Sequence, residues 1–264
     1  MTKRFCFTVD VDRDVNECVP GRTAAASLRG NVRFTSSETG TNAILDMLDA
    51  LGIKATFFVE ARTLENIDAS FGNNEVSMHG LDHEDMTGEM SGIALSDDEL
   101  SDIMQRSSDI IKDRTGTGPK GFRAPYMRTN EKIMRMLPKF GVGYDSSVYS
   151  ELGRKMHPYD IGGITEIPVP VGRDGSGKRI YGYLWPMHEG LRRPEEYVRM
   201  SQTVEEGVFV IATHSWHIAE SRDGTMSKER TKKNVSDTRE TIASILDGGF
   251  RAVRMADAAS EAQR

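Results

Sequence analysis

Short runs of apolar, aromatic and β-branched residues recur along the whole 264-residue chain and alternate with amphipathic stretches. Runs of this length and content, bounded by turn-forming residues, are typical of buried strands. The pattern predicts strands at Arg4–Val9, Lys54–Val59, Glu75–Met78, Gly121–Ala124, Val142–Asp145, Ile164–Val169, Val208–Thr213 and Phe250–Met255.

The amphipathic stretches predict helices between these strands. In residues 41–51 the apolar side chains recur on one helical face, and Gly52 follows as a stop signal. Ser96 and Glu99 form a capping box that begins a second helix, which is expected to end near Gly116. Further helices are expected at Asn130–Phe140, Pro194–Glu206 and Lys228–Asp247. Alternating strands and helices predict a parallel sheet, here a closed or nearly closed β/α barrel.

Composition narrows the class of protein. No low-complexity tract or Pro/Ser-rich linker divides the chain, so residues 1–264 are expected to form one domain. The 34 basic and 40 acidic residues give a net charge of −6, which does not favour nucleic acid as a partner. The acidic N-terminal segment does not resemble a signal peptide, and no apolar run is long enough for a membrane span. With Cys6 and Cys18 as the only cysteines, we expect a soluble, cytoplasmic protein without a membrane partner. Whether it forms a homo-oligomer is left open.

Polar residues follow the predicted strands at positions that a barrel would bring together. His79 and His83 are four residues apart, so both imidazoles can reach one metal ion, although surface histidines also have this spacing by chance. Asp10 and Asp12 end the first strand and can supply a carboxylate ligand. Barrels place functional groups at the C-terminal ends of their strands, so we expect all such residues to face one mouth. The other strand-end residues are Arg123–Tyr126, Asp145 and His214.

These residues resemble the five motifs of the polysaccharide deacetylases, the family-four carbohydrate esterases with a NodB homology domain, over nearly the whole chain. Thr8–Asp12 is similar to the first motif, with an extra residue between the aspartates, and Asn74–His83 is similar to the second. Arg123–Tyr126 matches the third motif, R-x-P-Y, without change. Tyr144–Ser147 and Ile211–His214 resemble the less specific fourth and fifth. The resemblance implies a distorted (β/α)7–8 barrel and a metal-dependent hydrolase of C–N bonds other than peptide bonds.

Two positions depart from the family pattern. Gly80 stands where many members have Ser or Thr, and the spacing of Asp10 and Asp12 leaves open which aspartate binds metal. Both variants are similar to those of intracellular members, which include amide and ring-opening hydrolases as well as sugar deacetylases. The substrate, a small molecule or a glycan, is therefore open.

The resemblance and the residue chemistry assign the central roles. Asp12, His79 and His83 are expected to hold one divalent ion and to leave positions for water and a substrate carbonyl. Zinc is the favoured ion, and the ligand types do not separate it from cobalt, manganese or iron. Asp10 is expected to be the base that takes a proton from water, and Arg123 to orient and ionise that carboxylate.

The remaining roles concern the leaving group and the substrate. His214 is expected to protonate the leaving amine, and a backbone N–H near Tyr126 to meet the oxyanion. The predicted substrate-binding residues are Tyr126, Pro125, Asp145 and Trp216. The sequence does not decide whether Trp185 and Trp216 are core aromatics or platforms for a sugar ring. Each position also has a structural interpretation, as a turn cap, an ion pair or a turn former.

Two long polar intervals are predicted to be loops. Arg13–Gly40 is expected to overhang the barrel mouth, and Gly172–Gly190 to form a mobile loop. Candidate substrate contacts in the first interval are Asn16, Arg22, Arg29 and Arg33.

The favoured function is N-deacetylation of an amino sugar or glycan by metal-activated water. The same apparatus acting on a ureide, a formamide or a cyclic imide is the main alternative, and a non-catalytic carbohydrate-binding barrel is disfavoured because base, ligands and acid are all present. A non-haem iron oxygenase shares the ligand types, but its common H-x-D spacing is absent. A zincin is excluded because no Glu follows His79.

Overall fold

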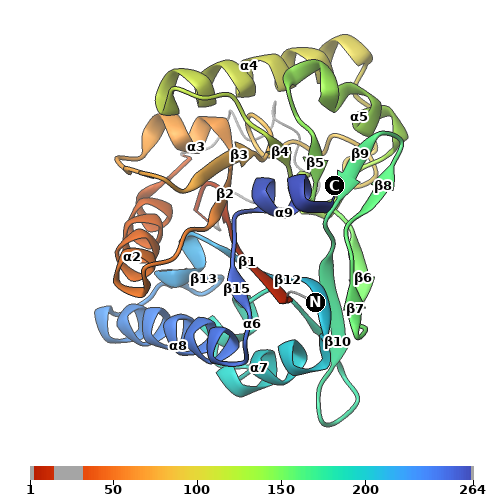
Figure 1. Cartoon of the computed structure of the whole chain (residues 1–264). Coiled ribbons are helices and arrows are strands. Elements are labelled where there is room, and N and C mark those ends of the chain that lie inside the picture. Colours follow the sequence, from red (N-terminus) through yellow and green to blue (C-terminus); the bar gives the residue numbers. More distant parts are fainter. Residues whose placement is uncertain (1–2, 15–31, 263–264) are drawn as a thin grey trace.

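A curled sheet forms the centre of the computed structural model, which describes residues 3–14 and 32–262 (Figure 1). Within these residues ten strands follow the order β7-β12-β1-β2-β3-β4-β5-β9-β8, with β15 beside β1. The pairs are parallel except for β8 and β9. The strands are β1 (Lys3–Val11), β2 (Thr56–Val59), β3 (Glu75–Met78), β4 (Gly121–Phe122), β5 (Tyr144–Asp145), β7 (Lys155–Met156), β8 (Tyr159–Ile161), β9 (Ile164–Glu166), β12 (Glu206–His214) and β15 (Arg251–Ala252).

A second, smaller sheet completes the barrel. It consists of β6 (Tyr149–Glu151), β10 (Val169–Arg173) and β11 (Arg179–Tyr181). After β11 the chain turns back into the barrel wall. The Gly182 amide donates to the Pro170 carbonyl (2.8 Å), the Ala212 amide donates to the Gly182 carbonyl (2.6 Å), and Tyr183 pairs with Ala212 of β12. The predicted distorted (β/α)7–8 barrel is therefore confirmed, and it closes through β10 and residues 182–184.

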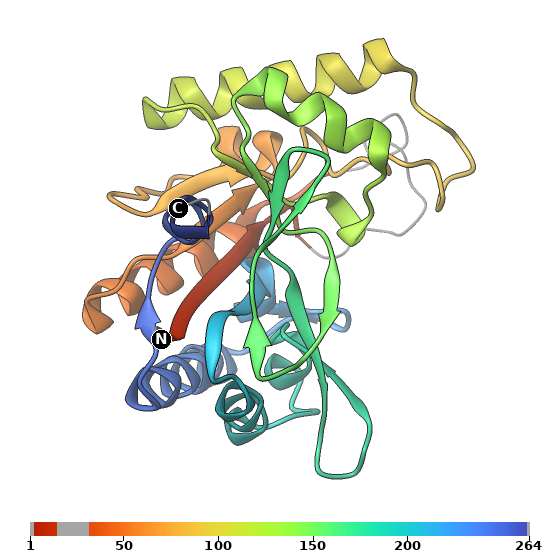
Figure 2. The same cartoon turned by 45° about the vertical axis from the view of Figure 1, so that its right-hand side comes forward.

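Helices cover the outside of the barrel, with α4 and α5 on one side and α7 and α8 on the other (Figure 2). They are α2 (Thr35–Leu51), α3 (Ala61–Asn66), α4 (Asp97–Thr115), α5 (Glu131–Met136), α6 (Trp185–His188), α7 (Pro194–Thr203), α8 (Lys228–Asp247) and α9 (Met255–Ala262). The capping box predicted for α4 is present, because Ser96 and Glu99 bond each other's backbone amides. Among the described residues, no helix combines the length and apolar character that a membrane span requires.

Helix α9 lies at the N-terminal end of the strands, opposite the predicted site (Figure 1). Its Ala256 amide donates to Glu75 Oε2 (2.9 Å), and the Met255 amide donates to Thr56 Oγ1 (2.9 Å). Glu75 and Thr56 are the first residues of β3 and β2. This helix was not predicted from the sequence. It occupies the end of the barrel opposite the proposed site.

The prediction for Arg13–Gly40 is partly wrong. Helix α2 begins at Thr35, well before the expected residue 41, because Asp14 Oδ1 accepts the Ser37 amide (2.9 Å) and supplies a cap from another part of the chain. Arg33 forms an ion pair with Glu220 (2.8 Å). The other three candidate contacts, Asn16, Arg22 and Arg29, lie outside the described residues, as does Cys18.

The predicted mobile loop Gly172–Gly190 is wrong. This interval contains the end of β10, the whole of β11 and helix α6. Asp174 Oδ1 accepts the amides of Ser176 (2.8 Å) and Lys178 (3.0 Å), which forms the turn between the two strands. The predicted strand Ile164–Val169 is likewise divided into β9 and β10, because Pro168 has no N–H for strand pairing.

Candidate metal centre and active site

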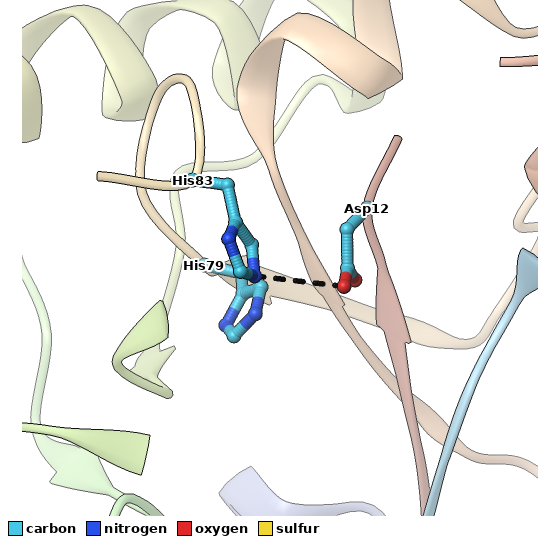
Figure 3. Close-up of side chains that lie close together, drawn as sticks. All are labelled: Asp12, His79 and His83. Atoms are coloured by element: carbon cyan, nitrogen blue, oxygen red, sulfur yellow. Dashed lines mark ion pairs between the residues drawn. The ribbon is translucent and has the colours of Figure 1, made fainter. Parts of the chain in front are cut away.

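The predicted metal-binding residues lie together at the C-terminal ends of β1 and β3. Asp10 lies on β1 and Asp12 directly follows Val11, the last residue of β1, and Asp10 is opposite His214 of β12 in the strand register. His79 directly follows β3. Side-chain atoms of Asp12, His79 and His83 lie within 4.8 Å of one another, and all three residues are buried (Figure 3).

A tight turn brings His83 back toward Asp12. Gly80 has φ of +82° and His83 has φ of 54°, and the Glu84 carboxylate accepts the amides of Leu81 (3.1 Å) and Asp82 (2.9 Å). A Cβ atom on Gly80 would lie 2.8 Å from Glu84 Oε2, in a conformation that L-residues rarely adopt. The departure from Ser or Thr at this position therefore has a backbone cause. The turn leaves His83 Nε2 3.6 Å from Asp12 Oδ2.

A hydrogen bond orients His79 as a metal ligand. His79 Nδ1 lies 2.7 Å from the Arg123 carbonyl oxygen. Because a carbonyl only accepts, Nδ1 carries the proton and Nε2 keeps its lone pair. Burial lowers the pKa of His79 and that of His83 still further, so both rings are neutral at neutral pH. Asp12 Oδ1 is buried without a hydrogen-bond partner. Two neutral imidazoles and an unpaired carboxylate oxygen fit a divalent ion such as zinc.

The second aspartate, Asp10, has a different environment. Its Oδ1 accepts from Arg123 (2.8 Å), and its Oδ2 accepts from the Tyr183 hydroxyl (2.6 Å). Burial alone would raise the pKa of Asp10, but the charge of Arg123 lowers it, as do His79 and His214 when acid protonates them, and the Tyr183 bond adds to this effect. The pKa therefore lies below its usual range, and Asp10 is ionised. For Asp12, burial and the charge of Asp10 raise the pKa well above its usual range.

Arg123 is held from several sides. Its Nε donates to the Ser146 carbonyl (3.1 Å), one terminal nitrogen to Ser146 Oγ (2.9 Å) and the other to Thr8 Oγ1 (2.9 Å). The guanidinium also lies over the Phe58 ring, 4.3 Å from its centre. These contacts fix the direction from which Arg123 approaches Asp10.

Asp145 is fully buried and bonds to Ser147 rather than to Arg123. Its Oδ1 accepts from Ser147 Oγ (2.6 Å), which in turn accepts the Ala124 amide (2.8 Å). Asp145 thus steadies the chain directly after Arg123. A direct contact with substrate stays a prediction.

His214 ends β12 between two aromatic rings. The Tyr183 and Trp216 rings each lie 5.4 Å from it, centre to centre. Burial lowers the pKa of His214 to about 4, so the imidazole is neutral at pH 7. Trp216 is 5% exposed and packs against both His214 and His217. Trp185, in contrast, is 40% exposed and stacks on His217, so of the two tryptophans it is the one open to solvent.

Tyr126 and Pro125 lie beside the metal-binding residues. The Tyr126 ring meets the His83 ring edge to face at 4.5 Å, and the Tyr126 backbone has φ of 59°. Pro125 is buried, and its Cγ lies 3.2 Å from the place that a Gly80 Cβ would occupy. Their roles toward a substrate remain predictions.

The sequence did not point to two features of this site. Tyr183 fell in an interval predicted to be a loop, and no local signal marks it. Arg13 and Glu60 form a buried ion pair beside Asp12. Glu60 directly follows β2, so the strand-end rule that selected Asp145 could have found it.

Comparison with known proteins agrees with this fold. The model of the polysaccharide deacetylase family matches residues 34–144. A peptidoglycan deacetylase-like protein of Gibberella zeae is 28% identical over 120 residues, covering 43% of this chain and 34% of that protein. The peptidoglycan deacetylase of Helicobacter pylori is 27% identical over 118 residues, covering 43% of this chain and 38% of that protein. The chain thus spans little more than a third of the length of these curated relatives.

Among solved structures, a Mycobacterium smegmatis protein named for the same family superposes with a TM-score of 0.65. The alignment covers 99% of this chain and 90% of that protein at 21% identity, and it shows a shared fold. The family match over residues 34–144 and the sequence relatives agree with the motif residues that the barrel brings to one mouth, so the chain is similar to the polysaccharide deacetylase family.

Proposed function

We propose that the protein is a metal-dependent hydrolase that removes an N-acetyl group from an amino sugar or glycan. One observation carries the proposal: two neutral histidines, one of them oriented by a hydrogen bond, and an unpaired carboxylate oxygen lie beside a second carboxylate that is ionised and held by an arginine. The two curated relatives described above are named for peptidoglycan deacetylation, which supports an acetylated glycan as the substrate class.

Asp12, His79 and His83 would hold the ion, and zinc suits this set of one oxygen and two nitrogen ligands. When bound, a divalent ion supplies Lewis acidity toward a water molecule and toward the acetyl carbonyl. Asp10 accepts a proton from that water at a carboxylate oxygen, while the Arg123 bond keeps the carboxylate ionised and in place.

His214 faces Asp10 across the strand register and protonates the leaving amine. Because burial lowers its pKa to about 4, His214 is neutral before the reaction begins. The acid role therefore requires that His214 takes up a proton during the catalytic cycle. A backbone N–H near Tyr126 donates to the developing oxyanion, and the contact of the Tyr126 ring with His83 supports this role.

The test combines metal analysis with a substrate screen. Wild type, His79→Ala and a control, His157→Ala, would be assayed for bound metal and for hydrolysis of N-acetylglucosamine oligomers, a ureide, a formamide and a cyclic imide. His157 is a suitable control because its side chain is 49% exposed, on the segment between β7 and β8. We expect acetate release by wild type and the control. His79→Ala should lose both metal and activity, because two remaining ligands rarely hold a catalytic ion.

Each other outcome has a definite meaning. Stoichiometric metal in His79→Ala would contradict the ligand assignment. Hydrolysis of only the ureide, the formamide or the imide would replace the N-acetyl substrate. Binding of the oligomers without hydrolysis by metal-loaded wild type would favour a carbohydrate-binding barrel.

A further inference from the structure

Tyr183 lies between the two groups that the proposed reaction uses as base and acid. Its hydroxyl donates to Asp10 Oδ2 at 2.6 Å, and its ring lies 5.4 Å from the His214 ring at an interplanar angle of 30°. The side chain is buried, with 4% exposure. A single residue therefore contacts both groups.

The backbone of Tyr183 is fixed by neighbours on both sides. Tyr183 pairs with Ala212 of β12, and the following Leu184 amide donates to the Ala212 carbonyl (2.9 Å). From α7, the Tyr197 hydroxyl donates to the Tyr183 carbonyl (2.9 Å). Because Ala212 is two residues before His214 on the same strand, Tyr183 and His214 share one rigid support.

The contact with Asp10 has a specific geometric effect. The outer torsion of an aspartate side chain has a broad, twofold energy profile, so one hydrogen bond leaves the carboxylate plane free to turn. Here Arg123 holds Oδ1 and Tyr183 holds Oδ2. Hydrogen bonds to an ionised oxygen are short and strong, as the Tyr183 bond is. With both oxygens held, the plane of the carboxylate is defined.

We propose that Tyr183 is a positioning residue of the hydrolytic site, whose hydroxyl sets the plane of the Asp10 carboxylate and whose ring sets the orientation of His214. This role rests on the proposed function, since it acts through the base and the acid named there. Tyr183 lies in the segment between β11 and α6, so this segment both closes the barrel wall and positions the two catalytic groups.

The test separates the hydroxyl from the ring. Tyr183→Phe removes the bond to Asp10 and keeps the ring against His214, whereas Tyr183→Leu removes both. Misplacement of a catalytic group by about 1 Å can cost about a hundredfold in rate, so we expect Tyr183→Phe to lower kcat by roughly tenfold to a hundredfold. KM and bound metal should stay at wild-type values, and Tyr183→Leu should lower kcat further.

The structure offers a matched control in Tyr144→Phe. The Tyr144 hydroxyl also donates to a buried carboxylate, that of Glu75, at 2.6 Å, but at the α9 end of the barrel. This control should keep the wild-type kcat. A similar fall of kcat in both Phe variants, or loss of metal from Tyr183→Phe, would overturn the positioning role.

The wild type separates failure of this role from failure of the proposed function. If metal-loaded wild type hydrolyses its substrate and Tyr183→Phe has the same kcat, the positioning role alone is wrong. If metal-loaded wild type hydrolyses none of the substrates, the proposed function fails and this role fails with it.

Discussion

Arg13 forms a buried ion pair with Asp82, and each residue is the direct neighbour in sequence of a proposed metal ligand. Arg13 follows Asp12, and Asp82 precedes His83. The Arg13 side chain also pairs with Glu60, through Nε at 2.8 Å, and its backbone amide donates to the same carboxylate at 2.8 Å. The ends of two strands and the turn that carries His83 are therefore joined by one buried cation.

Replacing this cation should weaken both the fold and the metal site. Breaking a buried ion pair by removing one partner costs roughly 3–5 kcal/mol, so Arg13→Gln should lower the free energy of unfolding by about that amount. Loss of groups that support metal ligands typically costs about 10–100-fold in metal affinity. Chemical denaturation and a chelator competition would measure these two effects.

Arg62→Gln provides the control for this prediction. Arg62 lies 3.5 Å from the same Asp82 carboxylate, but its side chain is 35% exposed, and partly exposed pairs contribute little. Wild-type metal affinity in Arg13→Gln would show that the turn carrying His83 holds its shape without the buried cation.

Asp10 and Asp12 should respond differently to the same substitution. Asp10→Asn keeps the shape of the side chain but cannot accept a proton from water, so the variant should bind metal and fold yet lose nearly all turnover. Asp12→Asn should lower metal affinity, and excess ion should restore part of the activity. Activity and bound metal would be titrated together for both variants.

The same experiment can reverse the assignment, which the spacing in the sequence left open. Rescue of Asp10→Asn by added metal would exchange the two roles. Wild-type rates in both variants would contradict the hydrolase proposal itself.

The role of His214 can be tested with two kinds of leaving group. His214→Ala should slow hydrolysis of an amide by about 10²–10⁴-fold, because an amine must be protonated as it leaves, and should slow an activated aryl ester much less. Rates on both substrates at one pH give the comparison, with His157→Ala as the exposed-histidine control. An equal loss on both substrates would assign His214 to structure or substrate binding.

Local sequence patterns predicted the sheet and most of the site because the relevant signals are themselves local. Two of the three proposed ligands, Asp12 and His79, directly follow a buried apolar strand, and parallel strands bring such ends to one edge. Helix α8 also matches its predicted bounds, Lys228–Asp247, because Ser227 caps its first turn and glycines follow it.

The parts that the sequence did not reveal depend on contacts between distant segments. The start of α2 is capped by Asp14, and α9 begins where Glu75 and Thr56 accept its first amides. Tyr183 reaches Asp10 only because its segment pairs with β12. Neither periodicity nor turn chemistry within a short window contains such information.

Outside the proposed chemistry, His188 should make stability depend on pH. It is fully buried on α6, with Nε2 3.0 Å from Thr238 Oγ1. Burial, with smaller effects from neighbouring positive groups, lowers its pKa to about 3, from an ordinary value of 6.5. Below pH 6.5 the unfolded chain therefore gains a proton that the folded protein excludes. Stability is lost as the pH falls from 6.5 toward about 3.

Comparison with His188→Gln isolates this effect. Glutamine can still donate to Thr238 but does not fill the space of the imidazole ring, so the variant should have a lower free energy of unfolding than wild type at pH 7.5. Because glutamine does not titrate, this deficit in unfolding free energy should shrink on acidification. One pH unit corresponds to about 1.4 kcal/mol for one proton, so the deficit should shrink by about 2 kcal/mol between pH 6.5 and pH 5. The pH dependence of wild type alone does not isolate His188, because burial also raises the pKa of Glu84 to about 7. Protonation of Glu84 therefore stabilises the folded protein as the pH falls through the same range. Since Glu84 is present in both proteins, its contribution cancels in the difference between their unfolding free energies. A deficit that stays constant from pH 7.5 to pH 5 would mean that His188 is protonated in the folded protein.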